Sequence, residues 1–352
     1  MSSLKGLTIS IIVPVYNGGE NFRKCLTSLV EADPPADEII VVADGDTDGS
    51  WDLAKEFNTR VLRLPLRKGP AHARNLGARI ARGDILFFVD ADVTLSPDAM
   101  SQIRETYRRH PDLAALFGSY DDKPSANNFL SQYKNLFHHY IHQTACEEAS
   151  TFWSGCGAIR RKVFMEWGGF DKSYRTPSIE DIELGYRLKK IGYRIRLCKG
   201  LQVKHLKRWG VSSLIKSDFF HRALPWTQLI LKDRHFINDL NIRLSSRMSI
   251  MVIYSFLAAF IGGYVWPGSF VFSGVLAILL LTVNMPVYKF FLRKRGICFM
   301  IRTIPWHWFY YFYSGLAFAI GVGRHLFFNG KSHKLRFSTI QSRLSDTIQD
   351  SE

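Results

Sequence analysis

Two aspartates, Asp90 and Asp92, stand at alternate positions directly after the apolar run at residues 84–89. Carboxylates at the end of a buried strand are costly unless a cation compensates their charge. A hard divalent ion such as Mg²⁺ or Mn²⁺ takes carboxylate oxygens and bridges to the phosphates of a bound molecule. An Asp-x-Asp sequence is a weak motif by itself, but its position after a strand favours a cation site.

A small, basic, glycine-containing segment at residues 68–77 opens a helix and includes Lys68 and Arg74. Helix N-termini and nearby cations stabilise phosphate groups, so this segment is a candidate phosphate site. The alternative is an ordinary helix with Arg74 exposed.

Glu180 and Asp181 fall in the first turn of a predicted amphipathic helix at residues 179–188. Acids in a first turn complement the helix dipole, which is a purely structural role. A carboxylate at that position could also act as a general base that takes a proton from a hydroxyl group.

Other candidate residues lie at strand ends or in loops. Asp44 follows the second predicted strand and can either accept hydrogen bonds from a nucleobase or ribose, or belong to a turn in which residues 48–50 cap the next helix. Gly155 belongs to a glycine-spaced loop that allows close backbone approach to a ligand, or is part of a tight turn. His205, taken alone, reads as a surface residue.

The first 120 residues alternate short apolar runs with amphipathic patterns, which predicts a parallel sheet built from βαβ units. The predicted strands are 7–15, 38–43, 60–64 and 84–89, and the predicted helices are 19–31, 49–57, 70–81 and 96–110. A further strand is predicted at residues 193–197. Such sheets bind ligands at the carboxyl ends of their strands, where these polar residues lie.

The last third of the chain is different in character. Residues 248–288 contain no Asp, Glu, Lys, Arg or His in 41 consecutive positions, and Trp266-Pro267-Gly268 interrupts them near the middle. A membrane crossing needs about 20 apolar residues, so this length predicts a helical hairpin. A third apolar stretch, residues 303–323, either crosses the membrane or lies in its interface, and a crossing is favoured.

The chain has 46 Lys and Arg against 31 Asp and Glu, a net charge of +15, which points to a phosphate-bearing partner, an anionic membrane or nucleic acid. Residues 199–247 hold ten basic residues and three acids, interleaved with aromatic residues that include Trp209 and Trp226. Because this segment, which also carries Arg222, continues into the uncharged hairpin, it predicts interfacial helices and makes nucleic acid the weaker alternative.

The N-terminus runs directly into a β pattern and lacks the features of a secretory signal, so the front domain is expected in the cytoplasm. The basic loop at residues 289–302 is expected on the same side by the positive-inside rule. A third crossing would place the basic tail, residues 329–352, on the opposite side. Five cysteines without metal-like spacing indicate reduced thiols.

Taken in order, the motifs resemble those of the inverting glycosyltransferase family 2, with the GT-A fold, over about residues 7 to 210. The matching pieces are residues 13–17 (with Pro14, Tyr16 and Asn17), 44–50, 69–77, 90–92 and 154–158, the pair Glu180-Asp181, and His205. The resemblance implies a nucleotide-diphosphate sugar donor near Asp44, a divalent cation at Asp90 and Asp92 with His205 as a further metal or phosphate contact, and Asp181 as the base.

Two departures from the family pattern stand out. Ala43 occupies a position where the family often has a second Asp, which affects base recognition. The Gln-x-x-Arg-Trp motif of processive synthases is missing, and the nearest text is residues 221–226. Transfer of a single sugar is therefore favoured over polymerisation.

These observations predict an α/β chain with a GT-A catalytic domain at residues 1–210, basic interfacial helices at 211–247, a membrane region at 248–328 and a polar tail. The leading hypothesis is a plasma-membrane enzyme that transfers a sugar to a lipid or lipid-linked acceptor, with Trp209, Arg222 and Trp226 on the acceptor side. The alternatives are a processive polysaccharide synthase and a non-catalytic membrane scaffold.

Overall fold

The computed structural model describes residues 6–233, 240 and 243–328, so the predicted tail lies outside the described residues. The four predicted N-terminal strands are confirmed, with ends that move by two residues at most. They form a four-stranded parallel section at one side of the sheet, β1 (Ile9–Val15), β2 (Glu38–Asp44), β3 (Arg60–Leu64) and β4 (Ile85–Val89).

The sheet continues beyond β4 in a mixed arrangement, with the order β3-β2-β1-β4-β8-β6-β9-β5 and with β7 paired to β9. The added strands are β5 (Val93–Leu95), β6 (Leu113–Tyr120), β7 (Glu148–Ala149), β8 (Cys156–Arg160) and β9 (Arg194–His205). The predicted strand at 193–197 was too short, because β9 continues to His205 through a register shift opposite β6. This continuation brings His205 into the sheet.

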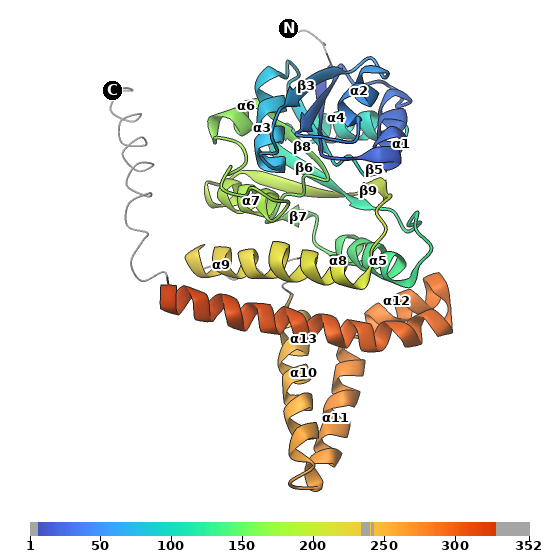
Figure 1. Ribbon diagram of the computed structural model, residues 1–352, viewed down its shortest axis with the longest axis vertical. Helices are drawn as coiled ribbons and strands as arrows, with labels where there is room; N and C mark the ends of the chain where they lie inside the picture. The colour runs from blue at the N-terminus through green and yellow to red at the C-terminus, as the bar shows by residue number, and fades with distance from the viewer. Residues whose placement is uncertain (1–5, 234–239, 241–242, 329–352) are drawn as a thin grey trace.

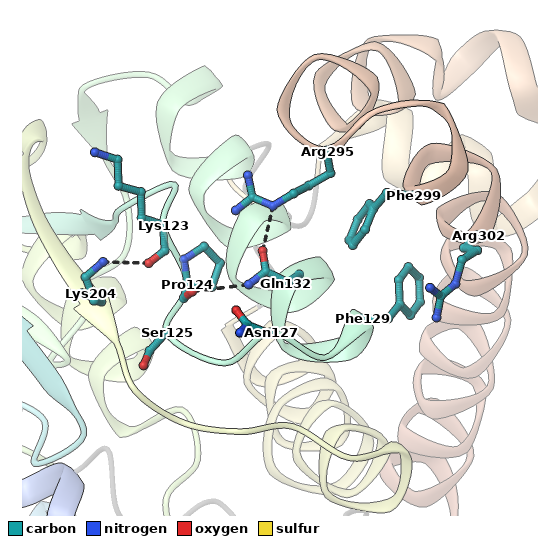
Figure 2. A pocket seen from close by; sticks show the side chains of 10 residues that line it. All are labelled: Lys123, Pro124, Ser125, Asn127, Phe129, Gln132, Lys204, Arg295, Phe299 and Arg302. Carbon is teal, nitrogen blue, oxygen red and sulfur yellow. Dashed lines mark hydrogen bonds between the residues drawn. The ribbon is translucent and has the colours of Figure 1, made fainter.

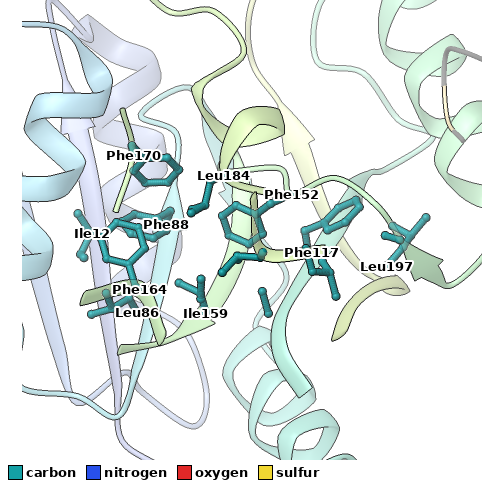
Figure 3. Close-up of a cluster of buried hydrophobic side chains, with 14 of the residues drawn as sticks. Ile12, Leu86, Phe88, Phe117, Phe152, Ile159, Phe164, Phe170, Leu184 and Leu197 are labelled. Atoms are coloured by element: carbon teal, nitrogen blue, oxygen red, sulfur yellow. The ribbon is translucent and has the colours of Figure 1, made fainter. Parts of the chain in front are cut away.

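Helices cover both faces of this sheet: α1 (Gly19–Val30), α2 (Ser50–Lys55), α3 (Pro70–Ile80), α4 (Ala99–Arg109), α5 (Phe129–Thr144), α6 (Arg161–Glu166) and α7 (Glu180–Lys190). Alternate residues of β4 point to opposite faces. Phe88 joins the core on the face of α3, α5 and α7, and Phe87 joins the core on the face of α1 and α4. Figure 3 shows the first core, in which Phe88 packs against Phe164 and Phe170.

The rest of the chain is helical: α8 (Val211–Lys216), the π-helix η1 (Ser217–Ala223), α9 (Leu224–Asp233), α10 (Leu244–Gly262), α11 (Gly268–Val283), α12 (Met285–Arg295) and α13 (Ile297–Phe328). Helices α10 and α11 form the expected hairpin, which projects away from the sheet (Figure 1). Among the described residues, α10 is long and apolar enough to cross a membrane, and α11 with α12, bent by 61°, forms a second candidate if the pair is one span.

The third apolar stretch lies within α13, which runs crosswise to the hairpin and beside α9, between the hairpin and the sheet (Figure 1). It is not among the candidate spans of the described chain. It packs against α9, α12 and α10, and it also reaches the catalytic half, where the hydroxyl of Tyr133 on α5 lies 2.9 Å from Nδ1 of His307. This arrangement favours the interfacial reading of residues 303–323 over a third crossing.

Candidate active site

Arg74 links Asp90, which follows β4, to Glu180, which begins α7. Its side chain is 6% exposed; Nη2 donates to Asp90 Oδ1 at 2.7 Å and Nη1 donates to Glu180 Oε1 at 2.8 Å. Burial by itself would lower the pKa of Arg74, but the charges of Asp90, Glu180 and Asp181 outweigh it and raise that pKa. Arg74 is therefore a fixed cation between the end of β4 and the start of α7, and the alternative of an exposed Arg74 is wrong.

The glycine-spaced loop at residues 154–158 connects the end of β4 to the start of α7 a second time. The backbone N–H and the hydroxyl of Ser154 donate to Asp181 Oδ2 at 2.9 and 3.1 Å, and the carbonyl of Gly155 accepts from the N–H of Asp90 at 3.3 Å. Close packing supports this arrangement, because a Cβ at Gly185 of α7 would lie 2.4 Å from the backbone nitrogen of Phe152. Hydrogen bonds to its carboxylate thus hold Asp181 in place beside the loop.

Asp92 and His205 form a second pair. Val93 lies opposite His205 in the β5–β9 ladder, and Asp92 Oδ2 is 3.5 Å from His205 Nε2. Burial would raise the pKa of Asp92, but the His205 ring opposes it and the pKa is lowered overall. The other ring nitrogen of His205 lies 2.8 Å from Asn135 Oδ1, and the ring stacks on Tyr120 with centroids 4.5 Å apart. His205 is buried, so the reading of it as a surface residue is wrong.

This pair fits a divalent cation that is shared with a substrate. Asp92 offers a carboxylate oxygen and His205 an imidazole nitrogen, whereas Asp90 is engaged by Arg74. Within the described ranges, no group of three or more His, Cys, Asp or Glu side chains is placed to hold a metal ion. Mg²⁺ commonly binds through one or two carboxylates and takes its remaining ligands from phosphates and water. The donors suit such a site and not a cage made wholly of protein.

Four of the residues predicted to bind the nucleotide sugar lie in or just after the ends of β1 and β2: Pro14, Tyr16, Asn17 and Asp44. Both carboxylate oxygens of Asp44 accept backbone N–H groups, from Lys68 at 2.7 Å and Gly69 at 2.8 Å, so Asp44 shapes the loop that leads into α3. Asn17 Oδ1 accepts from the N–H of Thr47 at 2.8 Å.

The neighbouring residues at this edge are either exposed to solvent or part of the sheet. Tyr16 is 42% exposed, with the Arg67 guanidinium 4.0 Å from its ring centroid. Pro14 pairs with Val42 in the β1–β2 ladder. Gly49 is the N-cap of α2, and the Asp48 carboxylate accepts from the N–H of Ser50, the first residue of that helix, at 3.0 Å.

The predicted acceptor-side residues lie between the sheet and the C-terminal helices. Trp226 Nε1 donates to the hydroxyl of Tyr186 on α7 at 2.9 Å, and the N–H of Trp209 donates to Ser131 at 2.7 Å. Burial holds the pKa of His138 well below its usual value, and the charges of His142 and Arg222 lower it further, so Arg222 faces α5.

Two residues in this region, Asn135 and Asp218, were not predicted from the sequence as site residues. Asn135 orients His205, and Asp218 Oδ2 accepts from the Tyr313 hydroxyl at 2.9 Å while its other oxygen accepts from Lys134. A lone Asn or Asp within an amphipathic helix gives no signal of such a role. The only trace in the sequence is that these polar residues occur on the apolar faces of their helices.

Comparison with known proteins finds a family match for the N-terminal part of the chain. Residues 10–168 match the family described as glycosyl transferase family 2. An uncharacterized glycosyltransferase, YibD of Escherichia coli, is 39% identical over 93 residues, which cover 25% of this chain and 27% of that protein. The poly-beta-1,6-N-acetyl-D-glucosamine synthase of Staphylococcus epidermidis is 29% identical over 202 residues, which cover 53% of this chain and 47% of that protein. The chain thus spans less than half the length of both relatives.

Among solved structures, a mannosyltransferase of Pyrobaculum calidifontis, in complex with GDP-Man and Mn²⁺, is 15% identical and has a TM-score of 0.55. The match covers 92% of this chain and 88% of that one, which shows that the two share a fold. The mixed sheet and the family match support the GT-A fold expected from the sequence. Residues 10–168 of the chain therefore form a domain that matches glycosyl transferase family 2.

Proposed function

We propose that this protein transfers a sugar from a nucleotide-diphosphate sugar to a lipid or lipid-linked acceptor at a membrane surface, with inversion at the anomeric carbon. The observation that carries the proposal is the double connection between Asp90 and Asp181, through Arg74 with Glu180 and through Ser154 with Gly155. These contacts would hold a donor site at the carboxyl end of β4 in a fixed position relative to a carboxylate base on α7.

The donor diphosphate would lie between Arg74 and the Asp92–His205 pair. Arg74 presents a buried cation there, and Lys68 begins the loop that leads into α3. A bound Mg²⁺ or Mn²⁺ would neutralise negative charge that develops on the diphosphate as it leaves. The Mn²⁺ in the mannosyltransferase of the same fold is consistent with such a cation.

Asp181 would accept the proton of the attacking hydroxyl. Ser154 holds Oδ2 of Asp181 with two hydrogen bonds, and carboxylate oxygens keep further lone pairs for an acceptor hydroxyl. One base and direct displacement invert the configuration, and no covalent intermediate on the protein is required.

The membrane part of the proposal rests on the C-terminal helices. The hairpin α10–α11 carries exposed apolar side chains along its length, among them Met251, Ile261, Val271 and Ile278. Helices α9 and α13 run crosswise between this hairpin and the sheet (Figure 1). A hairpin in the plasma membrane, with the catalytic domain in the cytoplasm, would hold the site close to a lipid acceptor.

Polymer synthesis is the second candidate, and the similarity to a poly-N-acetylglucosamine synthase favours it. A polymer channel needs many crossings, and the described residues provide one or two candidate spans. Product length on lipid extracts separates the two functions, since single transfer gives one added sugar and polymerisation gives a ladder.

The proposal is tested with the full-length protein in lipid nanodiscs, a panel of nucleotide sugars and lipid extract, with and without chelator. We expect metal-dependent nucleotide release. Asp181→Asn should lower the rate by at least about a thousandfold, because the base is lost while nucleotide binding persists. The matched control Asp171→Asn changes an exposed carboxylate that precedes the same helix and should keep the rate. No nucleotide release from any donor by the folded protein would contradict the proposal.

A further inference from the structure

A pocket of ≈ 710 Å³ opens where the catalytic half meets the C-terminal helices. Its walls come from the loop before α5, from the first turn of α5, from β9, from the end of α12 and from the first turns of α13, as Figure 2 shows. Its ten lining residues include four cations, Lys123, Lys204, Arg295 and Arg302, and no acid. The proposed transfer reaction uses none of these side chains.

The charges of this pocket are only partly compensated. Asp121 lies 3.3 Å from Lys204, which offsets that cation. Arg295 donates to three neutral carbonyl oxygens, those of the Gln132 side chain at 2.8 Å, of Lys294 at 2.9 Å and of Asp122 at 3.2 Å. These bonds fix the guanidinium in place, and among the described residues no carboxylate forms an ion pair with it.

Arg302 and Lys123 complete the basic wall. The Arg302 guanidinium lies 4.6 Å from the centroid of Phe129, and in the described part of the chain neither Arg302 nor Lys123 has an ion pair or side-chain hydrogen bond. Phe129 and Phe299, with ring centroids 5.0 Å apart, form an apolar wall beside these cations. The combination suits an amphipathic ligand with an anionic head, since arginine binds phosphate through two parallel hydrogen bonds.

The position of the pocket identifies the kind of ligand. Lys204 and His205 are consecutive in β9, so their side chains point to opposite faces of the strand, and the pocket is separate from the Asp92–His205 pair. Arg295 ends α12, the helix that follows the hairpin, and Arg302 lies on α13, which crosses the base of the hairpin (Figure 1). If the hairpin crosses a bilayer, the pocket lies at the level of the lipid headgroups.

We infer that this pocket binds the phosphate of an anionic phospholipid headgroup, with Arg295 and Arg302 as the main contacts and Phe129 and Phe299 against the start of the acyl chains. The inference rests on the membrane attachment proposed above. A lipid bound there would hold α12 and α13 against α5 at the membrane surface. A free phosphate shares this chemistry, and the experiment distinguishes the two sources.

The test is native mass spectrometry of the full-length protein in detergent, after equilibration with equal amounts of phosphatidylglycerol and phosphatidylcholine. We expect one phosphatidylglycerol to be retained selectively. Arg295→Gln/Arg302→Gln should lower that retention about tenfold more than the control Arg293→Gln/Arg324→Gln, which removes the same charge from α12 and α13 outside the pocket. If the double variant does not fold, Arg302→Gln alone replaces it in the test, because the Arg302 side chain is exposed.

Equal loss in the two double variants, or equal retention of the two lipids, would overturn the inference. Inorganic phosphate is titrated calorimetrically against the same proteins. Phosphate binding that Arg295→Gln/Arg302→Gln abolishes, with lipid retention unchanged, would overturn the assignment to a lipid. Failure of the proposed function is distinguishable, because lipid retention needs no sugar transfer. If the chain is not attached to the membrane, alkaline carbonate would extract all the variants from membranes, the control included.

Discussion

The guanidinium of Arg74 donates a hydrogen bond to Glu180 at 2.8 Å, although 106 positions separate the two residues. Glu180 also accepts from the N–H of Ser178 at 2.9 Å, and its side chain is 4% exposed. The carboxylate next to the proposed base therefore ties the start of α7 to α3 and β4. In the proposed mechanism Glu180 would position the start of α7, and Asp181 would be the carboxylate that meets the acceptor.

The first prediction distinguishes Glu180 from Asp181 by the stability that is lost when each is replaced. Glu180→Ala should lower the free energy of unfolding by about 3 kcal/mol, because Arg74 stays buried with one of its two carboxylate partners removed. Asp181→Ala should cost about 1 kcal/mol, since it breaks hydrogen bonds of a half-buried group. Urea unfolding of the detergent-solubilised protein, followed by near-ultraviolet circular dichroism, measures both. Equal losses would mean that Glu180 carries no special structural weight.

The second prediction concerns the orientation of His205. Asn135→Leu removes the group that contacts Nδ1 at 2.8 Å while keeping the side-chain volume similar. Groups that orient a metal-binding histidine typically contribute about 10- to 100-fold to metal affinity, and we expect a loss of that size. Manganese titration by electron paramagnetic resonance gives the affinity directly. Gln143→Leu, on the same helix, is the control, and an equal effect there would contradict the assignment.

The third prediction is a pH dependence. Burial lowers the pKa of His142 from its ordinary 6.5 to about 3. Between these values the unfolded chain binds a proton that the folded chain does not, so stability is full above pH 6.5 and falls as the pH drops toward 3. The slope should be about 1.4 kcal/mol per pH unit for this residue. Unfolding measured from pH 7 to 4 should give a shallower slope for His142→Gln, and an unchanged slope would exclude this histidine as the cause.

The fourth prediction tests the hairpin. Val265 is 91% exposed at the turn between α10 and α11, and Arg293 lies near the end of α12. If the hairpin crosses the bilayer, Val265→Cys and Arg293→Cys should react with an impermeant maleimide from opposite sides of sealed vesicles. The exposed native cysteines, Cys146 and Cys298, are replaced by serine in both variants. Labelling of both positions from one side would show that the hairpin does not cross.

The positions of the first four strands, with polar residues after β2 and β4, could be predicted because they depend on local periodicity. An apolar run of five to seven residues between turn-forming groups specifies a buried strand, and parallel strands bring their carboxyl ends to one edge. The hairpin is equally local, since 41 residues without charge suit two crossings. The sequence therefore determined which residues could gather at the site and where the chain turns apolar.

Only the tertiary structure decided how those residues are used. Whether Arg74 is exposed or buried between Asp90 and Glu180 depends on how α7 packs, and the role of Asn135 depends on β9 continuing to His205 past a register shift. The direction of α13 is set by contacts such as Tyr133 with His307. Composition and spacing report on local burial and periodicity, whereas these pairings join residues far apart in the chain and are fixed by packing alone.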